Sequence, residues 1–194
     1  MLPFPHRPSL NKPKIDRKAY YNIIGSRGCP GHCTYCTVNS FLNRHRRFGI
    51  NRWRSRSAEN IFLEMKELHQ QGVRNFLFYD DNWIGIREVG LERVVSLCRM
   101  IIEDGTDDIS FFAAARQDSL LPEDIDDILI MKQAGLHAIS FGLEAANPKQ
   151  LKFLGKIYDP GPVRELIPLI LGNGIVVRTG YIMFYPYSTF ESIR

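Results

Sequence analysis

Short apolar runs alternate along the chain with longer segments in which apolar residues recur every three or four positions. The short runs have the length and composition of buried β-strands, and the longer segments have the periodicity of amphipathic helices. Glycine, proline or polar residues separate most of them, as turns require. The pattern predicts strands at residues 20–25, 73–79, 109–115, 137–142 and 175–184. It predicts helices at residues 57–72, 87–104, 122–135, 148–154 and 161–172, with another beginning within 188–194.

This alternation of strand and helix is typical of a parallel α/β fold, in which right-handed connections place the strands side by side. A doubly wound sheet and a (β/α) barrel both satisfy the pattern. The Gly-x-Gly-x-x-Gly run of a dinucleotide site follows none of the strands, which disfavours the doubly wound sheet. Distinctive polar residues end the strands instead, where barrel enzymes carry their active sites. We therefore expect a partial (β/α) barrel with about five β/α units.

Three details make this prediction specific. The second strand is apolar at residues 76–78, so we expect it to be buried on both faces. In the third helix, Ile125, Ile128 and Leu129 should face the core. Pro168 lies within the helix predicted at residues 161–172 and should kink or divide it.

The composition is that of one ordinary globular domain: of 194 residues, 44% are hydrophobic and 24% are charged. Residues 1–19 hold four prolines and no apolar periodicity, so we interpret them as an arm or linker before a core at residues 20–194. No apolar run is long enough to span a membrane, and no secretory signal opens the chain. We expect a cytoplasmic protein without membrane contacts. The net charge of +4 is too small to indicate nucleic-acid binding by itself.

The strongest chemical signal is the sequence Ser-Arg-Gly-Cys-Pro-Gly-His-Cys-Thr-Tyr-Cys at residues 26–36. Cys29, Cys33 and Cys36 have the spacing Cys-x3-Cys-x2-Cys, which brings three thiolates onto one short loop. Thiolates grouped in this way hold iron–sulfur clusters or zinc. Three protein ligands on a four-iron cluster leave one iron open to another ligand. Cysteines used for a metal also favour a reducing, cytoplasmic setting.

Other interpretations of the cysteines stay open at this point. Two of them could form a disulfide and leave one free thiol. The three could hold a structural zinc ion with His32 or His45 as the fourth ligand, although zinc sites usually draw on a second, separate ligand pair. They could also hold an electron-transfer cluster, for which Cys98 is the one remaining cysteine.

The loop resembles the signature of the radical S-adenosylmethionine (SAM) enzymes, Cys-x3-Cys-x-aromatic-Cys, with Tyr35 at the aromatic position. In that family the three cysteines hold a 4Fe–4S cluster whose open iron binds SAM. An electron from the cluster cleaves SAM to methionine and a 5′-deoxyadenosyl radical, which abstracts hydrogen from a substrate. The resemblance covers about residues 20–194. The family core is a partial barrel of six β/α units, so a chain with five strands looks like a C-terminally incomplete core.

The resemblance also assigns SAM contacts to the ends of the first two strands. Tyr35 would lie against the adenine. The second strand ends in Tyr-Asp-Asp-Asn at residues 79–82, where many relatives have Gly-Gly-Glu and meet the SAM amino group. Asp80 and Asp81 would serve there, because two neighbouring carboxylates need a cation or a donor. Alternatively, either residue caps the turn that follows.

Three further contacts are implied at later strands. Arg116, after the third strand, could bind the methionyl carboxylate, or it could pair with Asp118 or Glu144. Glu144 ends a Gly-x-Glu run that in the family meets the ribose or amino group of SAM. Lys156 ends a Leu-Gly-Lys run whose cation reaches SAM in relatives, although it could equally be a solvated helix end. The fifth strand departs from the family pattern, because residues 183–189 lack the expected glycines and glutamate.

The acidic pair at the second strand resembles the cobalamin-dependent and methylthio-transferring branches of the family, which suggests methyl or methylthio transfer. The proline-rich arm resembles a segment that joins a cobalamin-binding domain to the core, so cobalamin could act only through a domain outside this chain. The family implies a flavodoxin- or ferredoxin-like electron donor. Six arginines within residues 43–56 suit an anionic partner, such as a substrate phosphate, nucleic acid or an acidic reductase, and Trp53 could stack on a base.

Two functions from different classes therefore compete. The first is a radical SAM enzyme that acts on an unknown substrate. The second is a zinc- or cluster-bearing module that binds RNA through its arginine-rich segment without catalysis; a non-catalytic remnant is a third outcome. The polar residues at the strand ends favour the enzyme, since a binding module does not need them. No catalytic acid or base can be assigned, because in this family the radical itself takes the hydrogen.

Overall fold

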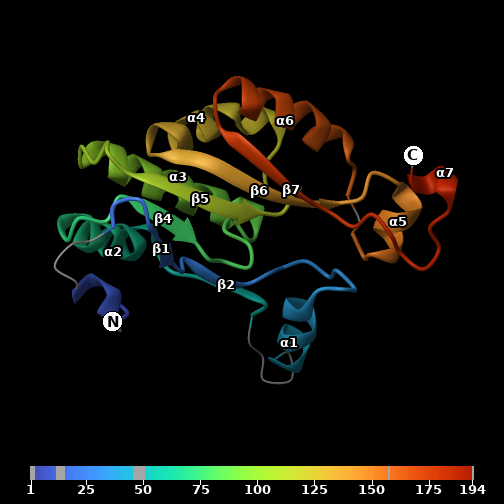
Figure 1. The fold of residues 1–194 in the computed structure, drawn as a ribbon, viewed down its shortest axis with the longest axis horizontal. Coiled ribbons are helices and arrows are strands. Elements are labelled where there is room, and N and C mark those ends of the chain that lie inside the picture. The colour runs from blue at the N-terminus through green and yellow to red at the C-terminus, as the bar shows by residue number, and fades with distance from the viewer. Residues whose placement is uncertain (1–2, 12–15, 46–50, 157, 194) are drawn as a thin grey trace.

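The computed structural model describes residues 3–11, 16–45, 51–156 and 158–193 (Figure 1). Its centre is a sheet of five parallel strands in the order β1-β4-β5-β6-β7. The five strands are β1 (Tyr20–Ile23), β4 (Asn75–Phe78), β5 (Ser110–Ala115), β6 (Leu136–Glu144) and β7 (Val176–Tyr181). Each lies within or close to a predicted strand, and the sheet does not close on itself. The partial barrel expected from the sequence is therefore confirmed.

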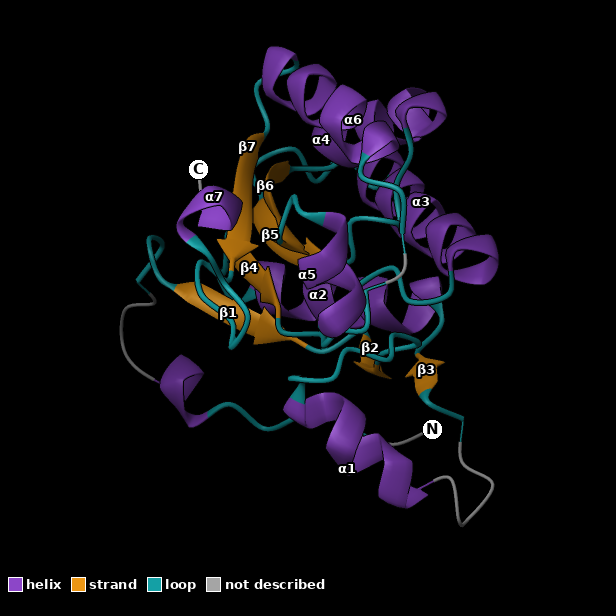
Figure 2. Ribbon diagram, turned by 90° about the vertical axis from the view of Figure 1, so that its right-hand side faces the viewer, coloured by secondary structure: helices purple, strands orange, loops and turns teal. Residues whose placement is uncertain are grey.

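Helices follow the strands of this sheet along the chain. They are α2 (Ala58–Gln70), α3 (Arg87–Glu103), α4 (Ile125–Gln133), α5 (Pro148–Phe153), α6 (Gly161–Gly172) and α7 (Phe190–Ile193), with short 3-10 turns η1 (Pro8–Asn11) and η3 (Pro122–Asp124). α2 packs on α3, α3 on α4, and α4 on α6. Figure 2 shows α3, α4 and α6 on the same side of the sheet. Ser57 begins α2, because its side chain accepts a hydrogen bond from the backbone N–H of Asn60.

Burial alternates along β5, where Phe111, Ala113 and Ala115 are buried and the residues between them are only partly buried. The buried side chains meet the helices, and Phe78, Trp83 and Phe111 form a tilted and edge-to-face aromatic group at the centre of this core. One face of the sheet is thus packed, and the other face remains partly accessible.

Two expectations about packing were wrong in detail. Leu77 is only partly buried, so β4 is not buried on both faces; in a sheet covered by helices on one side, alternate residues lose their cover. Leu129 is 38% exposed on α4, while Ile128 beside it is buried, because the helix turns only one narrow stripe toward the core. Pro168 was expected to kink or divide its helix, and α6 is continuous through it, so the division does not occur.

The sequence pattern missed three elements around the cysteines. α1 (Thr37–His45) follows the cysteine loop directly. β2 (Ser26–Gly28) pairs antiparallel with β3 (Trp53–Ser55), and β3 lies within the arginine-rich segment at residues 43–56. Strands of three residues are too short to show a period. Trp53 is 7% exposed and its indole N–H donates to the backbone oxygen of Asn82 at 3.3 Å, so it does not offer a surface for base stacking.

None of the helices in the described part of the chain is long and apolar enough to cross a bilayer.

A glycine contact holds the start of α3 against the loop that follows β4. A Cβ at Gly90 would lie 1.6 Å from the backbone oxygen of Ile84, whereas a Cβ at Gly172, the last residue of α6, meets no atom within 4 Å. We expect Gly90→Ala to lower the free energy of unfolding by at least about 1–3 kcal/mol through overpacking. Gly172→Ala should leave it unchanged or raise it by up to about 1 kcal/mol. Urea denaturation of both variants measures this; equal stability of the two would contradict the close packing.

Candidate functional site

The cysteine loop leaves β2 and enters α1, beside the carboxyl end of β1. α5 and α7 lie beyond the carboxyl ends of β6 and β7 (Figure 1). The loop meets α5 through Thr34, whose N–H donates to the oxygen of Leu154 and whose hydroxyl donates to the oxygen of Phe153, both at 3.0 Å. Gly155 follows with φ +67°, and a Cβ there would come within 2.8 Å of the His32 oxygen. Glycine at position 155 therefore allows α5 to end against the loop.

The three cysteines of the loop are free thiols, each partly buried. Burial raises the pKa of Cys29, and the charges of Cys33 and Cys36 raise it further. The hydrogen bond from the N–H of Gly31 and the charge of Arg116 act in the opposite direction and lower it. The two other thiols are thus near enough to act on Cys29 electrostatically. In the part of the chain that the structure describes, no three His, Cys, Asp or Glu side chains gather around one metal position.

The single-metal interpretation loses its histidine ligand. Both ring nitrogens of His32 lie near Nη1 of Arg52, at 2.6 and 2.8 Å, and Nη2 of Arg52 donates to the Gly31 oxygen at 2.6 Å. Arg52 thus contacts both ring nitrogens through which His32 would bind a zinc ion. The other candidate, His45, has a side chain outside the described part. Cys98 is fully buried in α3, where burial raises the pKa of its thiol, and it lies among apolar residues of the core.

Asp80 and Asp81 hold the chain that enters the loop. Asp80 is buried and accepts hydrogen bonds from the N–H of Gly25 at 3.1 Å and the hydroxyl of Ser26 at 2.5 Å. Asp81 accepts from the N–H of Gly28 at 2.8 Å, directly before Cys29. The carboxylates at the end of β4 thus fix the backbone on the amino side of the first cysteine.

A buried cation accompanies Asp80. Burial raises the pKa of Asp80, which the hydrogen bonds from Ser26 and Gly25 and the charge of Arg93 lower. Burial also lowers the pKa of Arg93. Its guanidinium donates to the backbone oxygen of Trp83 and lies over the Trp53 ring, with the guanidinium carbon 5.7 Å from the ring centroid. The pair stays buried because each charge compensates the other.

Arg116 lies directly against the cysteine loop. A Cβ at Gly31 would be 2.1 Å from Nη1 of Arg116 and 3.3 Å from the sulfur of Cys29. Nε of Arg116 donates to Asp118 at 2.8 Å, and Nη2 donates to the other oxygen of the same carboxylate. The ion pair with Asp118 is therefore present, and the guanidinium still borders the thiol.

Glu144 and Lys156 form the opposite side of the site with Tyr35. Glu144 has φ +66°, unusual for a residue with a side chain, at a register shift between β6 and β7. Its Oε1 lies 3.6 Å from Nζ of Lys156. Burial raises the pKa of Tyr35, as do a hydrogen bond to Glu144 and the charges of Glu144 and Cys33. The backbone strain at Glu144 therefore falls where its carboxylate meets the loop.

Lys156 is not a solvated helix end. It is 6% exposed, and its Nζ donates to Oε1 of Gln117 at 3.2 Å and to the Gly142 oxygen. Burial lowers its pKa, against the charge of Glu144 that raises it. A buried lysine held among acceptors at the end of a parallel sheet is typical of a functional site.

Sequence reasoning missed three buried polar residues of this site. Ser26 and Asn82 link the loop entrance to β5: Ser26 donates to the Asn82 oxygen at 3.1 Å, and Oδ1 of Asn82 accepts from the N–H of Arg116 at 3.4 Å. Gln117 is buried, and its amide nitrogen has no hydrogen-bond partner among the described residues. The available signal was their place in the sequence, since Asn82 follows Asp81, Gln117 follows Arg116 and Ser26 precedes the cysteine loop.

Comparison with known proteins decides the family. Residues 23–194 match the family described as the radical SAM superfamily. The chain belongs to that superfamily.

Similar proteins of the radical SAM superfamily are much longer than this chain. An uncharacterized methyltransferase of Pyrococcus horikoshii is 28% identical over 95% of the chain and 37% of its own length. A tRNA-2-methylthio-N(6)-dimethylallyladenosine synthase of a Thermoanaerobacter species is 28% identical over 90% of the chain and 36% of its own length. The solved structure of the cobalamin-dependent SAM radical enzyme OxsB is 21% identical and superposes with a TM-score of 0.72. The match covers 90% of this chain and 25% of the OxsB chain. The chain thus spans about a third of the length of these curated relatives.

The residues present fit the cofactors that this radical SAM membership implies, a 4Fe–4S cluster and SAM. Three reduced, partly accessible thiols share one loop, as a cluster with one open iron requires. Around them lie the cations of Arg116 and Lys156, the carboxylate of Glu144 and the unpaired amide of Gln117. Groups of both signs beside the thiols suit a ligand that carries an ammonium and a carboxylate.

We expect Asp80→Asn to lower the free energy of unfolding by about 1–3 kcal/mol, because the amide cannot accept from both Gly25 and Ser26 and leaves Arg93 without its counter-charge. Asp81→Asn is the matched control: Asp81 is exposed, so its change should cost less than about 1 kcal/mol. Urea denaturation of the cluster-free protein measures both. Equal loss in the two variants would refute the structural role of Asp80.

Proposed function

We propose that the chain is the core of a radical SAM enzyme in which Cys29, Cys33 and Cys36 hold a 4Fe–4S cluster. The observation that carries the proposal is that three free thiols share one short loop, which borders the ion pairs Arg116–Asp118 and Glu144–Lys156. When bound, the reduced cluster supplies the electron that cleaves SAM, and the 5′-deoxyadenosyl group so released takes a hydrogen atom from the substrate.

The chain's own residues divide into two groups in this proposal. Tyr35, Arg116, Glu144 and Lys156 border the thiols and would bind and orient SAM. Asp80 has both carboxylate oxygens engaged by the loop entrance, so it would position the loop, and its contact with SAM would be indirect. Asp81 uses only Oδ2 for Gly28 among the described residues, which leaves Oδ1 for the SAM ammonium.

The reaction class that suits this core is methyl or methylthio transfer, because two of the similar proteins are named as a methyltransferase and a tRNA-2-methylthio-N(6)-dimethylallyladenosine synthase. Cobalamin would enter through a further domain of a longer protein, as suggested by the likeness to OxsB. A flavodoxin- or ferredoxin-like protein would supply electrons. The substrate is not specified by the chain. The RNA-binding alternative loses support because Trp53 is buried and because Arg52 is engaged by the loop.

The cysteine assignment predicts which thiols carry iron. Anaerobically reconstituted chain should hold close to four irons and should form 5′-deoxyadenosine from SAM and a reductant. We expect Cys33→Ala to abolish both, and Cys29→Ala and Cys36→Ala to act in the same way. Cys98→Ala is the matched control, since this buried thiol should leave iron content unchanged. Zinc in place of iron, or cleavage by Cys33→Ala at the wild-type rate, would refute the proposal.

If Tyr35, Arg116, Glu144 and Lys156 bind SAM, a change at one of them should affect SAM binding and leave cluster assembly intact. Glu144→Gln removes the charge beside Tyr35 and Lys156 and should weaken SAM binding about tenfold, the worth of one charge-assisted hydrogen bond. Iron content should not change, because Glu144 is not a ligand. Equilibrium dialysis of reconstituted protein with SAM measures the affinity, and Glu165→Gln, an exposed glutamate of α6, serves as the control. Unaltered affinity in Glu144→Gln would exclude Glu144 from the SAM site.

A further inference from the structure

A cavity that none of the three loop cysteines lines lies at the β1 edge of the sheet. Its volume is about 720 Å³, within the range of small-molecule sites. The N-terminal arm closes one side, and the β2–β3 pair and the start of α2 close the others. Four arginines and one glutamate line it, so its charge is strongly positive. The charged residues of the cavity are Arg7, Arg27, Arg54, Arg56 and Glu64.

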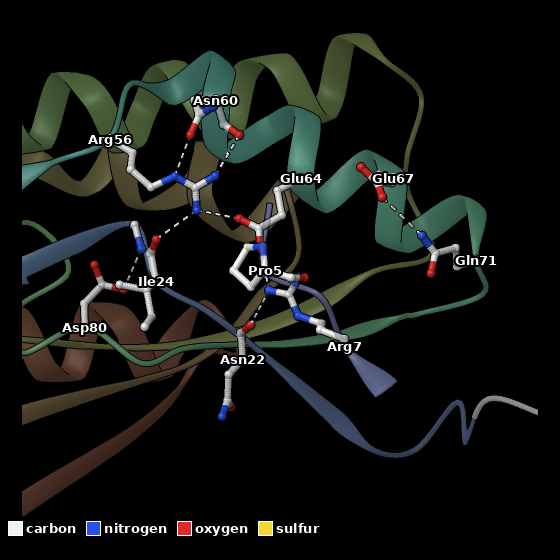
Figure 3. Close-up of polar contacts among 11 residues, drawn as sticks. Pro5, Arg7, Asn22, Ile24, Arg56, Asn60, Glu64, Glu67, Gln71 and Asp80 are labelled. Carbon is white, nitrogen blue, oxygen red and sulfur yellow. Dashed lines mark hydrogen bonds and ion pairs between the residues drawn. The ribbon is translucent and has the colours of Figure 1, made fainter. Parts of the chain in front are cut away.

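Two of these arginines pair with the glutamate, whose single negative charge offsets one of the two positive charges. Glu64 is 2% exposed and forms ion pairs with Arg7 of the arm and with Arg56, and Figure 3 shows both guanidinium groups directed at its carboxylate. Arg7 also donates to the Asn22 oxygen at 3.0 Å, and Arg56 donates to the Ile24 oxygen at 3.0 Å. These contacts fix the arm on the core and form a rigid wall.

The other two arginines have no such compensation. Arg27 and Arg54 stand directly opposite one another in the antiparallel β2–β3 pair, so their side chains share one face. Neither side chain has a hydrogen bond or an ion pair with another residue of the described ranges. Like charges at directly opposite positions destabilise a strand pair. An anion held between the two guanidinium groups would reverse this repulsion and gain bidentate hydrogen bonds.

The remaining lining is apolar. Pro3, Phe4 and Pro5 of the arm and Ile24 of the core face the same cavity, and the guanidinium of Arg56 lies 5.7 Å from the centre of the Phe4 ring. An apolar wall beside a pair of arginines suits a molecule with a phosphate at one end and a flat or apolar body at the other.

We propose that this cavity binds an organic phosphate of mononucleotide size, with the phosphate between Arg27 and Arg54 and the body against residues 3–5 and Ile24. A small molecule fits the observations better than an acidic protein segment, because the two arginines and the apolar residues line one cavity of about 720 Å³. The site needs neither cluster nor SAM, so it stands apart from the proposed function.

Uridine 5′-monophosphate is a suitable probe, because its base differs from the adenine of SAM. Isothermal titration of the whole chain should show saturable binding at one per chain, weaker at high salt. Uridine should not bind measurably. Arg27→Gln and Arg54→Gln should each weaken binding about tenfold, as for one charge-assisted contact. Arg164→Gln, an exposed arginine of α6 at the other edge of the sheet, should bind as the wild type does.

Stability distinguishes a ligand site from a structural pair. Without ligand, both variants should unfold at the same urea concentration as the wild type or a higher one, because the repulsion is removed. The proposal is overturned if uridine binds as well as its phosphate, if only an oligouridylate binds, or if no probe binds at millimolar concentration. It is also overturned if the two variants bind normally, or lose stability in proportion to their loss of binding.

Discussion

The hydrogen bonds between the end of β4 and the chain that enters the cysteine loop are the contacts on which the site depends. A loop of glycines, proline and cysteines has few side chains to satisfy its own backbone. Asp80 and Asp81 supply acceptors for residues that lie 53 to 55 positions earlier in the chain. The loop therefore acquires its shape only when β1 and β4 are paired, which ties the arrangement of the thiols to the folding of the sheet.

The order and type of the main elements could be predicted because buried strands and amphipathic helices leave periods in the sequence. The same periods say little about which neighbours cover a residue. Leu77 has the character of a core residue, but the face of β4 that carries it is only partly covered. Leu129 lies just outside the buried stripe of α4. The β2–β3 pair was missed because three-residue strands carry no period and are joined by long-range pairing.

In the site, too, local sequence patterns identified individual residues but did not identify their partners in space. The cysteines were found by local spacing, and Glu144 and Lys156 by runs that resemble those of the family. The structure brings Oε1 of Glu144 within 3.6 Å of Nζ of Lys156. The partners could not be read from the sequence, because they depend on side-chain direction across the sheet. Asp80 looked like a ligand residue, yet its oxygens accept from the backbone N–H of Gly25 and the hydroxyl of Ser26. Gln117 carried no signal of its own until its burial was known.

The close approach of Arg116 to Gly31 has a consequence for the evolution of such a loop. The guanidinium occupies the space that any side chain at position 31 would need. Neither position can therefore change freely: a residue larger than glycine at one requires a shorter or redirected residue at the other. The two positions, on different strand ends and 85 residues apart (116 − 31), are expected to vary together as one steric unit among homologous chains.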